Sequence, residues 1–75
     1  MKFGELMQVF KGYRVRVKEL GADGEEKVRE INLLDTVDGH RLLARYSEAA
    51  VVRFSTGTLE FDGQMFPALE VTVRV

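Results

Sequence analysis

The chain of 75 residues contains no cysteine and no tryptophan, and it has only one proline and one histidine. Without cysteine there is no disulfide, no thiol nucleophile and no cysteine-ligated zinc or iron–sulfur site, a composition that fits a reducing compartment. We therefore expect a cytoplasmic protein. A chain this short buries only about 60% of its unfolded surface, so self-association is the remaining means of adding stability.

Neither sign of charge dominates, because the chain has 11 lysines and arginines and 12 acidic residues, which gives a net charge of −1. This balance disfavours both a strongly basic nucleic-acid binder and an acidic nucleic-acid mimic. The longest uncharged apolar runs fall far short of the roughly 20 residues that a transmembrane helix needs, and the N-terminus lacks the apolar core of a signal peptide. We expect a soluble, unexported protein that does not bind membranes.

The clearest pattern lies between Gly12 and Leu20, where apolar and charged residues alternate. Such alternation is typical of a half-buried β-strand, and it turns Tyr13, Val15 and Val17 inward. Ahead of this strand, apolar residues recur at i, i+3, i+4 and i+7, which predicts a helix of about two turns that covers the sheet. Its apolar face consists of Phe3, Leu6, Met7 and Phe10.

After the strand, the Asp23-Gly24 pair predicts a hairpin to a second extended run over residues 25–34, antiparallel to the first. The second run changes parity, and a bulge near Arg29 and Glu30 reconciles its pattern. We expect acidic residues of this run to lie across from the basic face of the first strand and to set the register. They are Glu25, Glu26 and Glu30.

Downstream, residues 41–46 fit a short helix, with a strand as the alternative, and residues 49–55 read as a buried strand that Thr56-Gly57 closes. Asp62-Gly63 then predicts a small hairpin that projects beyond the sheet. Pro67 makes the return arm of this hairpin an edge or a bulge. The alternating residues 69–75 predict a strand near the middle of the sheet.

These patterns predict one α+β domain over residues 1–75, an antiparallel sheet of about four strands with both helices packed on one face. Open sheet edges in so small a domain also predict a homodimer, without indicating which edge pairs. The predicted core consists of Phe3, Leu6, Phe10, Val15, Val17, Ile31, Leu42, Val52, Phe54, Leu69, Val71 and Val73.

Candidate catalytic chemistry is sparse. His40 with Asp35 and Asp38 offers a metal site or an acid–base pair, but a turn at Asp38-Gly39 followed by a helix cap is the favoured interpretation. The hydroxyl-rich residues 55–58 offer groups to a phosphate, yet the P-loop lysine and its helix are missing, so a strand-ending turn is favoured. We predict no enzyme, no cofactor and no metal.

One feature exceeds what a minimal fold requires, namely the basic outward face of the first strand. Its simplest interpretation is a solvated face neutralised by the neighbouring glutamates. The functional interpretation is a surface for an acidic protein, with the phosphate backbone of a nucleic acid as the alternative, which the absence of an outward aromatic on this strand disfavours. The predicted partner-binding residues are Lys11, Arg14, Arg16 and Lys18, with Met65 and Phe66 of the projecting hairpin as a second contact.

The order of elements resembles that of small proteins of unknown function from bacterial prophages and mobile elements. The resemblance rests on the helix start at residues 5–10, the strand at residues 13–18, the Asp23-Gly24 hairpin, residues 50–54 and the terminal strand; residues 58–67 depart from it as an insertion. It implies a protein-binding accessory role, such as inhibition of a host defence nuclease in the manner of anti-CRISPR proteins. A phage structural or assembly accessory protein is the alternative, and no functional residue carries over.

Overall fold

The computed structural model describes residues 1–10, 14–33 and 37–74, and within these ranges the side chains of residues 29–33, 38 and 61 are not among those described. The predictions for Lys11, Gly12 and Tyr13, and for the side chain of Ile31, therefore lie outside the described part. The elements in chain order are α1 (Phe3–Val9), β1 (Arg14–Leu20), β2 (Glu26–Leu33), α2 (Val37–Tyr46), β3 (Ala50–Phe61) and β4 (Gln64–Arg74).

The four strands form one mixed sheet in the order β2-β1-β4-β3. The pairs β1–β2 and β3–β4 are antiparallel hairpins, whereas β1 and β4 are parallel. The predicted α+β class is confirmed, but the purely antiparallel sheet is wrong. The connection through α2 explains the difference: the helix returns the chain before β3 starts, so β2 and β3 run in the same direction and their hairpin partners do too.

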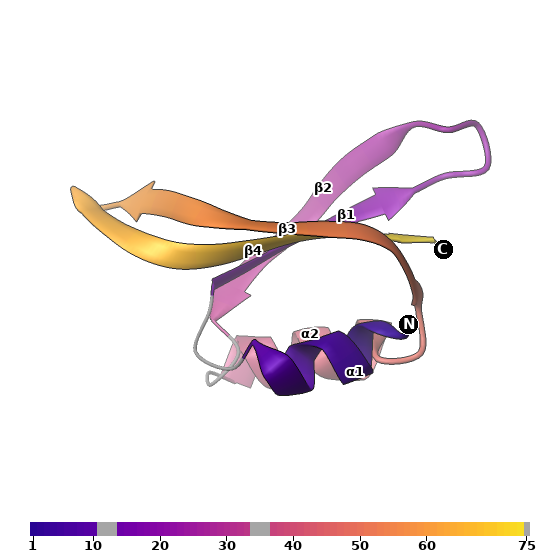
Figure 1. Cartoon of the computed structure of the whole chain (residues 1–75), viewed down its shortest axis with the longest axis horizontal. Coiled ribbons are helices and arrows are strands. Elements are labelled where there is room, and N and C mark those ends of the chain that lie inside the picture. The colour runs from indigo at the N-terminus through magenta and orange to yellow at the C-terminus, as the bar shows by residue number, and fades with distance from the viewer. Residues whose placement is uncertain (11–13, 34–36, 75) are drawn as a thin grey trace.

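Both helices cover the same face of the sheet (Figure 1). The strands that meet at the centre are the most apolar ones, since β1 contributes Val15 and Val17 and β4 contributes three fully buried residues. Pairing β1 with β4 next to the helices buries the apolar residues of both strands against the same helix layer. The predicted central position of the last strand is confirmed. The core cluster consists of Phe3, Leu6, Met7, Val15, Val17, Leu42, Tyr46, Leu69, Val71 and Val73.

The first residues tie α1 to the edge of the sheet. The backbone N–H of Val51 donates to the carbonyl of Met1 at 2.8 Å, and the N–H of Phe3 donates to the carbonyl of Ala49 at 2.9 Å. A Cβ on Gly4 would lie 3.1 Å from the carbonyl oxygen of Ser47, so glycine permits this close approach. The chain start therefore covers the edge of β3 only as far as Val51.

Two bulges set which residues face the core. In β2 the register shifts where Val17 aligns with Glu30 and Lys18 with Val28, so the predicted bulge at Arg29 is confirmed. A second bulge, not predicted, lies in β3 between Val51 and Arg53. It reverses the parity of the strand. Val51 therefore packs against the core while Val52 is 37% exposed.

Phe54 aligns with the buried Val71 and therefore faces the helix side, as predicted, but it is 43% exposed and not part of the core. It lies toward the end of the helix layer, where its ring meets that of Phe10 edge to face at 6.1 Å. Phe10 itself is partly buried and packs against the core cluster. The two rings thus close the margin of the core instead of filling its centre.

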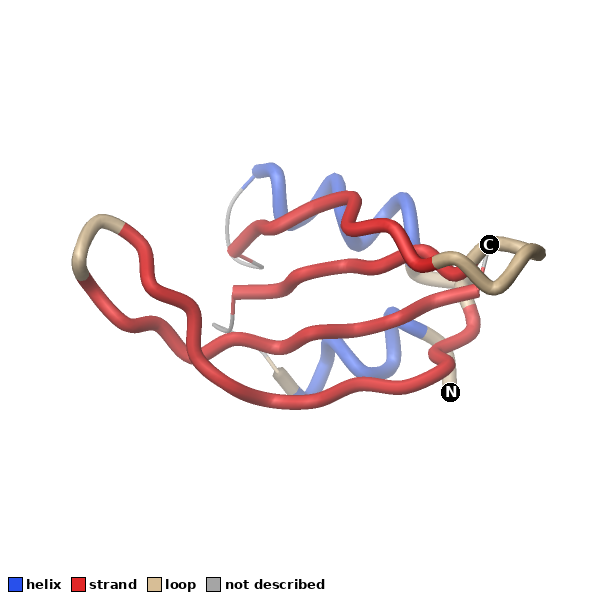
Figure 2. Tube along the Cα trace, turned by 90° about the horizontal axis from the view of Figure 1, so that it is seen from above, coloured by secondary structure: helices blue, strands red, loops and turns tan. Residues whose placement is uncertain are grey.

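The hairpin that joins β3 and β4 turns at Asp62 and Gly63, with φ angles of 51° and 75°. Two consecutive positive φ values are the geometry of the two-residue turn that Asp-Gly favours, so the predicted turn is confirmed. Strand β3 continues through Thr56 and Gly57, so the predicted end of the strand there is wrong. Because the described pairing of β1 with β4 begins at Ala68, the tip of the hairpin projects beyond the described part of β1 as a two-stranded ribbon (Figure 2).

Helix α2 is longer than predicted, because it begins at Val37. The expected turn at Asp38-Gly39 is therefore wrong, and both residues belong to the first turn of the helix. The strand alternative for residues 41–46 is wrong as well. Leu42 and Tyr46 are buried, and Leu43 packs against the core cluster, as their helical spacing predicts.

Candidate binding surface on the open sheet face

The side of the sheet opposite the helices, here called the open face, is covered by neither helix (Figure 1). Its residues follow from the strand registers, because directly paired residues point to the same side. The row across β1 and β4 begins with Arg14 beside Ala68 and continues with Arg16 beside Glu70 and Lys18 beside Thr72. The basic row predicted for the first strand therefore lies on this open face.

Glu70 is the main neutralising group for that row. Its carboxylate accepts from Lys18 at 3.0 Å and from Arg16 at 3.4 Å. The hydrogen bond from Lys18 is the largest cause that holds the pKa of Glu70 below its ordinary value, with the charges of Lys18 and Arg16 acting in the same direction and burial opposing them. The acid that pairs with the basic row thus comes from the parallel neighbour β4.

The expected pairing with the glutamates of the second strand is wrong. Arg14, Arg16 and Lys18 align with Leu33, Ile31 and Val28 of β2. Glu30 aligns with Val17, and Glu26 aligns with Leu20 at the far end. The bulge at Arg29 places Glu30 beside Val17, and Glu26 reaches only the end of β1, so none of Arg14, Arg16 and Lys18 has a glutamate of β2 as its aligned partner.

Glu26 has a more distant partner, since its carboxylate pairs with the guanidinium of Arg53. These two residues belong to β2 and β3, the opposite edge strands of the sheet. The contact requires the open face to curve so that its two edges approach each other. Thr72, between them on β4, is only 3% exposed although no helix covers it. The residues aligned with Thr72 on its two sides are Lys18 and Arg53, whose long side chains flank the threonine.

The projecting hairpin joins the basic row through Phe66. The guanidinium carbon of Arg14 lies 5.2 Å from the centre of the Phe66 ring, within cation–π range. Met65 is 61% exposed, but as the adjacent residue in the strand it points to the other side of the ribbon. The structure therefore brings Phe66 together with Arg14, on the face that also carries Arg16 and Lys18, and places Met65 on the other side.

A shallow hollow of about 150 Å³ opens beside this contact. Ala68 and Gly57 are paired across β3 and β4, and their small side chains leave the space. Arg16, Glu70 and Ser55 provide polar walls and Leu59 an apolar one. Residues 55–58, which offered hydroxyls to a phosphate in the sequence, thus form one side of a mixed polar and apolar depression in a continuous strand.

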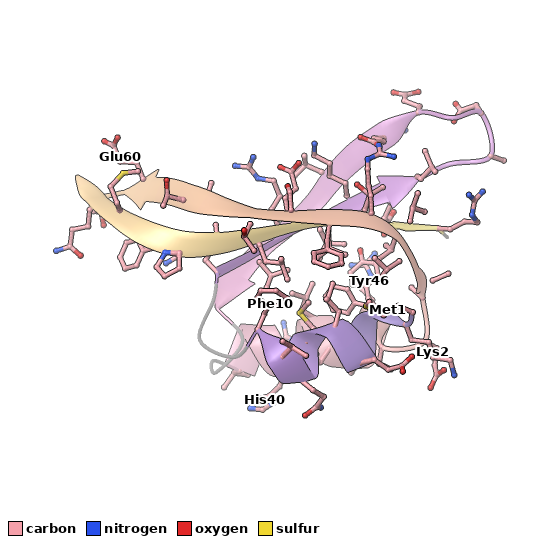
Figure 3. The ribbon with its side chains drawn as sticks, viewed as in Figure 1. Met1, Lys2, Phe10, His40, Tyr46 and Glu60 are labelled. Atoms are coloured by element: carbon pink, nitrogen blue, oxygen red, sulfur yellow. The ribbon has the colours of Figure 1, made fainter. Side chains whose placement is uncertain are left out.

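His40 lies elsewhere, exposed on α2 and pointing away from the sheet (Figure 3). Asp35 and the side chain of Asp38 are outside the described part. Within the described residues, no group of three or more His, Asp or Glu side chains is arranged to hold a metal ion. None of the described helices is long and apolar enough to span a membrane.

Comparisons with protein-family models, with curated proteins and with solved structures found no match to this chain. The surface is therefore interpreted from its own geometry and charge.

Proposed function

We propose that the protein is a non-catalytic binding module whose open face takes an acidic segment of another protein. The charge of that face carries the proposal. Among the described side chains, five basic ones lie on it (Arg14, Arg16, Lys18, Arg53 and Arg74) against two acidic ones (Glu26 and Glu70), whereas the whole chain has a net charge of −1. An excess of one sign on one face attracts a partner of the opposite sign.

The backbone supports the same interpretation. Alternate residues of a strand are about 7 Å apart, so the cations of β1 stand in a row whose spacing the sheet maintains. The contacts of Lys18 and Arg16 with Glu70 and of Arg14 with Phe66 restrict these side chains further. A partner therefore meets charges that are already ordered, which lowers the entropic cost of binding.

An acidic protein is favoured over the nucleic-acid alternative. Single-stranded nucleic acids are held by aromatic platforms on which successive bases stack. Of the described side chains on the open face, Phe66 is the only aromatic, and it is partly buried against Arg14. An inhibitor of a host defence protein and a virion-assembly accessory protein, the two roles that the prophage resemblance implies, would both use such a protein-binding face.

A site-specific photocrosslinker tests the proposal. A benzophenone amino acid replaces Val28 on the open face or, as the matched control, Val37 on α2; both valines are exposed, at 52% and 76%. In lysate of the cell that makes the protein, we expect a discrete protein adduct from position 28 and none from position 37. An adduct that nuclease digestion removes would favour the nucleic-acid alternative instead.

Charge reversal identifies the residues responsible. Arg14→Glu with Arg16→Glu should reduce the yield of the adduct at least tenfold, a change of about 1.4 kcal/mol in binding free energy, and Phe66→Ala should weaken it further. The control is Arg41→Glu with Arg45→Glu on α2, which changes the net charge equally and should leave the adduct intact. Equal loss in both double variants would show that the net charge of the molecule, and not the open face, attracts the partner.

A further inference from the structure

We propose that a second copy of this chain pairs with the free edge of β3, so that the two sheets join into one across a two-fold axis at Gly57. The proposal concerns a different surface from the open face and does not depend on the binding function. It rests on the unpaired backbone of one strand, on the direction in which its hydrogen-bonding groups point and on its charge pattern.

Strand β3 is an edge strand of 12 residues. Its outer edge is covered at the start, where Met1 accepts the hydrogen bond from Val51 and Lys2 bridges to Ala50. Among the described residues, no further backbone pairs with that edge between Arg53 and Phe61. Neither proline nor lysine, the residues that usually protect an exposed edge, occurs in this stretch.

The turn determines which backbone groups point outward. In a two-residue hairpin the residues that flank the turn, Phe61 and Gln64, exchange both hydrogen bonds with each other. Alternation along the strand then directs the N–H and C=O of Leu59, Gly57 and Ser55 toward β4. The groups of the even-numbered residues face solvent at the free edge: Phe54, Thr56, Thr58 and Glu60.

An antiparallel second copy can satisfy all four residues in one register. With Gly57 opposite its own counterpart on the axis, Thr56 aligns with Thr58 of the other copy and Phe54 aligns with Glu60. Each of the four aligned pairs exchanges two hydrogen bonds. The same register spans the whole free stretch, because Gly57 is the middle of residues 53–61 and the other copy's turn falls where Met1 already covers the edge.

The side chains of the edge are complementary to themselves in this register. One end of the stretch carries Arg53 and the turn at the other end carries Asp62, so antiparallel alignment brings one opposite-charge pair together at each end. Threonines paired across strands pack well. Gly57 places no side chain at the axis, and a Cβ added there would meet nothing within 4 Å in one copy.

Pairing also accounts for the length of the hairpin. An isolated two-stranded ribbon is marginally stable in water, yet the tip of β3 and β4 extends past the end of β1. In the proposed dimer, residues 58–60 of one copy lie beside residues 54–56 of the other, which makes the base of the projecting ribbon an interior part of a four-stranded unit.

A single cysteine at the axis is the test, because the chain contains none of its own. In the proposed register the two copies of Gly57 form a non-hydrogen-bonded pair with Cα atoms about 4.5 Å apart, within the range of a disulfide. Under mild oxidation Gly57→Cys should form a covalent dimer with a yield of more than half. The matched control is Ser55→Cys on the same strand and face, whose two copies would be about 14 Å apart and should remain monomeric.

The mass in solution completes the test. At tens of micromolar, light scattering of the wild type should give twice the monomer mass of 8.5 kDa. Thr56→Lys with Thr58→Lys places lysines opposite each other and should weaken association at least tenfold while the circular dichroism spectrum is unchanged. Cross-linking at Ser55 in place of Gly57 would overturn the register, and a monomer mass with no cross-linking at either position would overturn the dimer.

Discussion

Tyr46 links the helix layer to a charged residue of the sheet. Its ring is buried at 3% exposure and meets Phe3 edge to face at 5.9 Å, while its hydroxyl donates to the carboxylate of Glu19 at 2.5 Å. Glu19 thereby has a partner at the helix side of β1, where Val15 and Val17 are fully buried. A buried tyrosine whose hydroxyl reaches a partly buried acid combines apolar burial with a charge-assisted hydrogen bond.

We predict that Tyr46→Phe lowers the free energy of unfolding by about 1–2 kcal/mol, because it removes a hydrogen bond to a charged group while retaining the ring. Urea unfolding measures the change. Glu19→Gln is the matched variant: its amide oxygen still accepts from Tyr46, so the loss should be smaller. A Tyr46→Phe variant as stable as the wild type would show that the contact contributes nothing net.

Residue spacing predicted much of the core but not all of it. The helical repeat identified Phe3, Leu6 and Leu42, whose burial the structure confirms. Val52 was misplaced because the bulge between Val51 and Arg53 adds one residue to β3. Phe54 faces the helix side as predicted, aligned with Val71, but it lies at the margin of the core and is 43% exposed. The alternation of apolar and polar residues reveals such an insertion only where polar residues show the change of face. They do so in β2, but the start of β3 is largely apolar and shows no change.

At the scale of elements, the parallel pairing of β1 and β4, here called the seam, has an apolar side toward the helices and a charged side on the open face. Its charged side depends on Glu70, and the lowered pKa of this carboxylate has a defined sign. A group whose pKa is lower in the folded state stabilises the fold above the ordinary glutamate pKa of about 4.3. That contribution is lost as the pH falls through the folded-state pKa.

We predict that Glu70→Gln costs less than about 1 kcal/mol at neutral pH, because the group is partly exposed and solvent screens its ion pairs. The cost should shrink below about pH 4 and in high salt. A double-mutant cycle with Lys18→Met isolates the pair. Its coupling free energy should fall as the pH is lowered below the ordinary glutamate pKa of about 4.3 and Glu70 takes up its proton; a coupling that does not change with pH would contradict the assignment.

Elements with a local signal were predictable, whereas their partners were not. Both Asp-Gly turns carry their own conformational requirement, and the structure has them where the sequence indicates. The acid opposite the basic row was missed because Glu70 lies 54 residues from Arg16 in the chain. No spacing or composition links residues so distant, and the only signal was the alternation that already placed Glu70 on the outward side of its strand.

At the scale of the whole molecule, the arrangement separates a face that carries helices from a face that carries charge. The sequence indicated the basic row itself, and the structure adds that Phe66 lies against it and that Met65 does not. The hollow beside Arg16 had no sequence signal, since it arises from Gly57 and Ala68 meeting across two strands. Tertiary contacts of this kind depend on register, which composition does not encode.

The parallel seam between β1 and β4 also determines how fast the protein can fold. Each hairpin closes a short loop, but the seam that joins them links residues 54 positions apart. Closing so long a loop loses chain entropy before the stabilising contacts of the seam have formed. The transition state should therefore be the docking of two partly formed hairpins, and refolding should take milliseconds or longer.

This gives a kinetic prediction for Leu69, which is fully buried on β4 and aligned with Val15. Leu69→Ala should cost about 2–5 kcal/mol, and stopped-flow refolding should show much of that loss as slower folding. Changes at the Asp62-Gly63 turn should also slow folding, because this turn closes one of the two hairpins that dock. A Leu69→Ala variant that refolds at the wild-type rate would place the rate-limiting step elsewhere. Because the central strands β1 and β4 are far apart in the sequence, their pairing makes the sheet cooperative and slows folding.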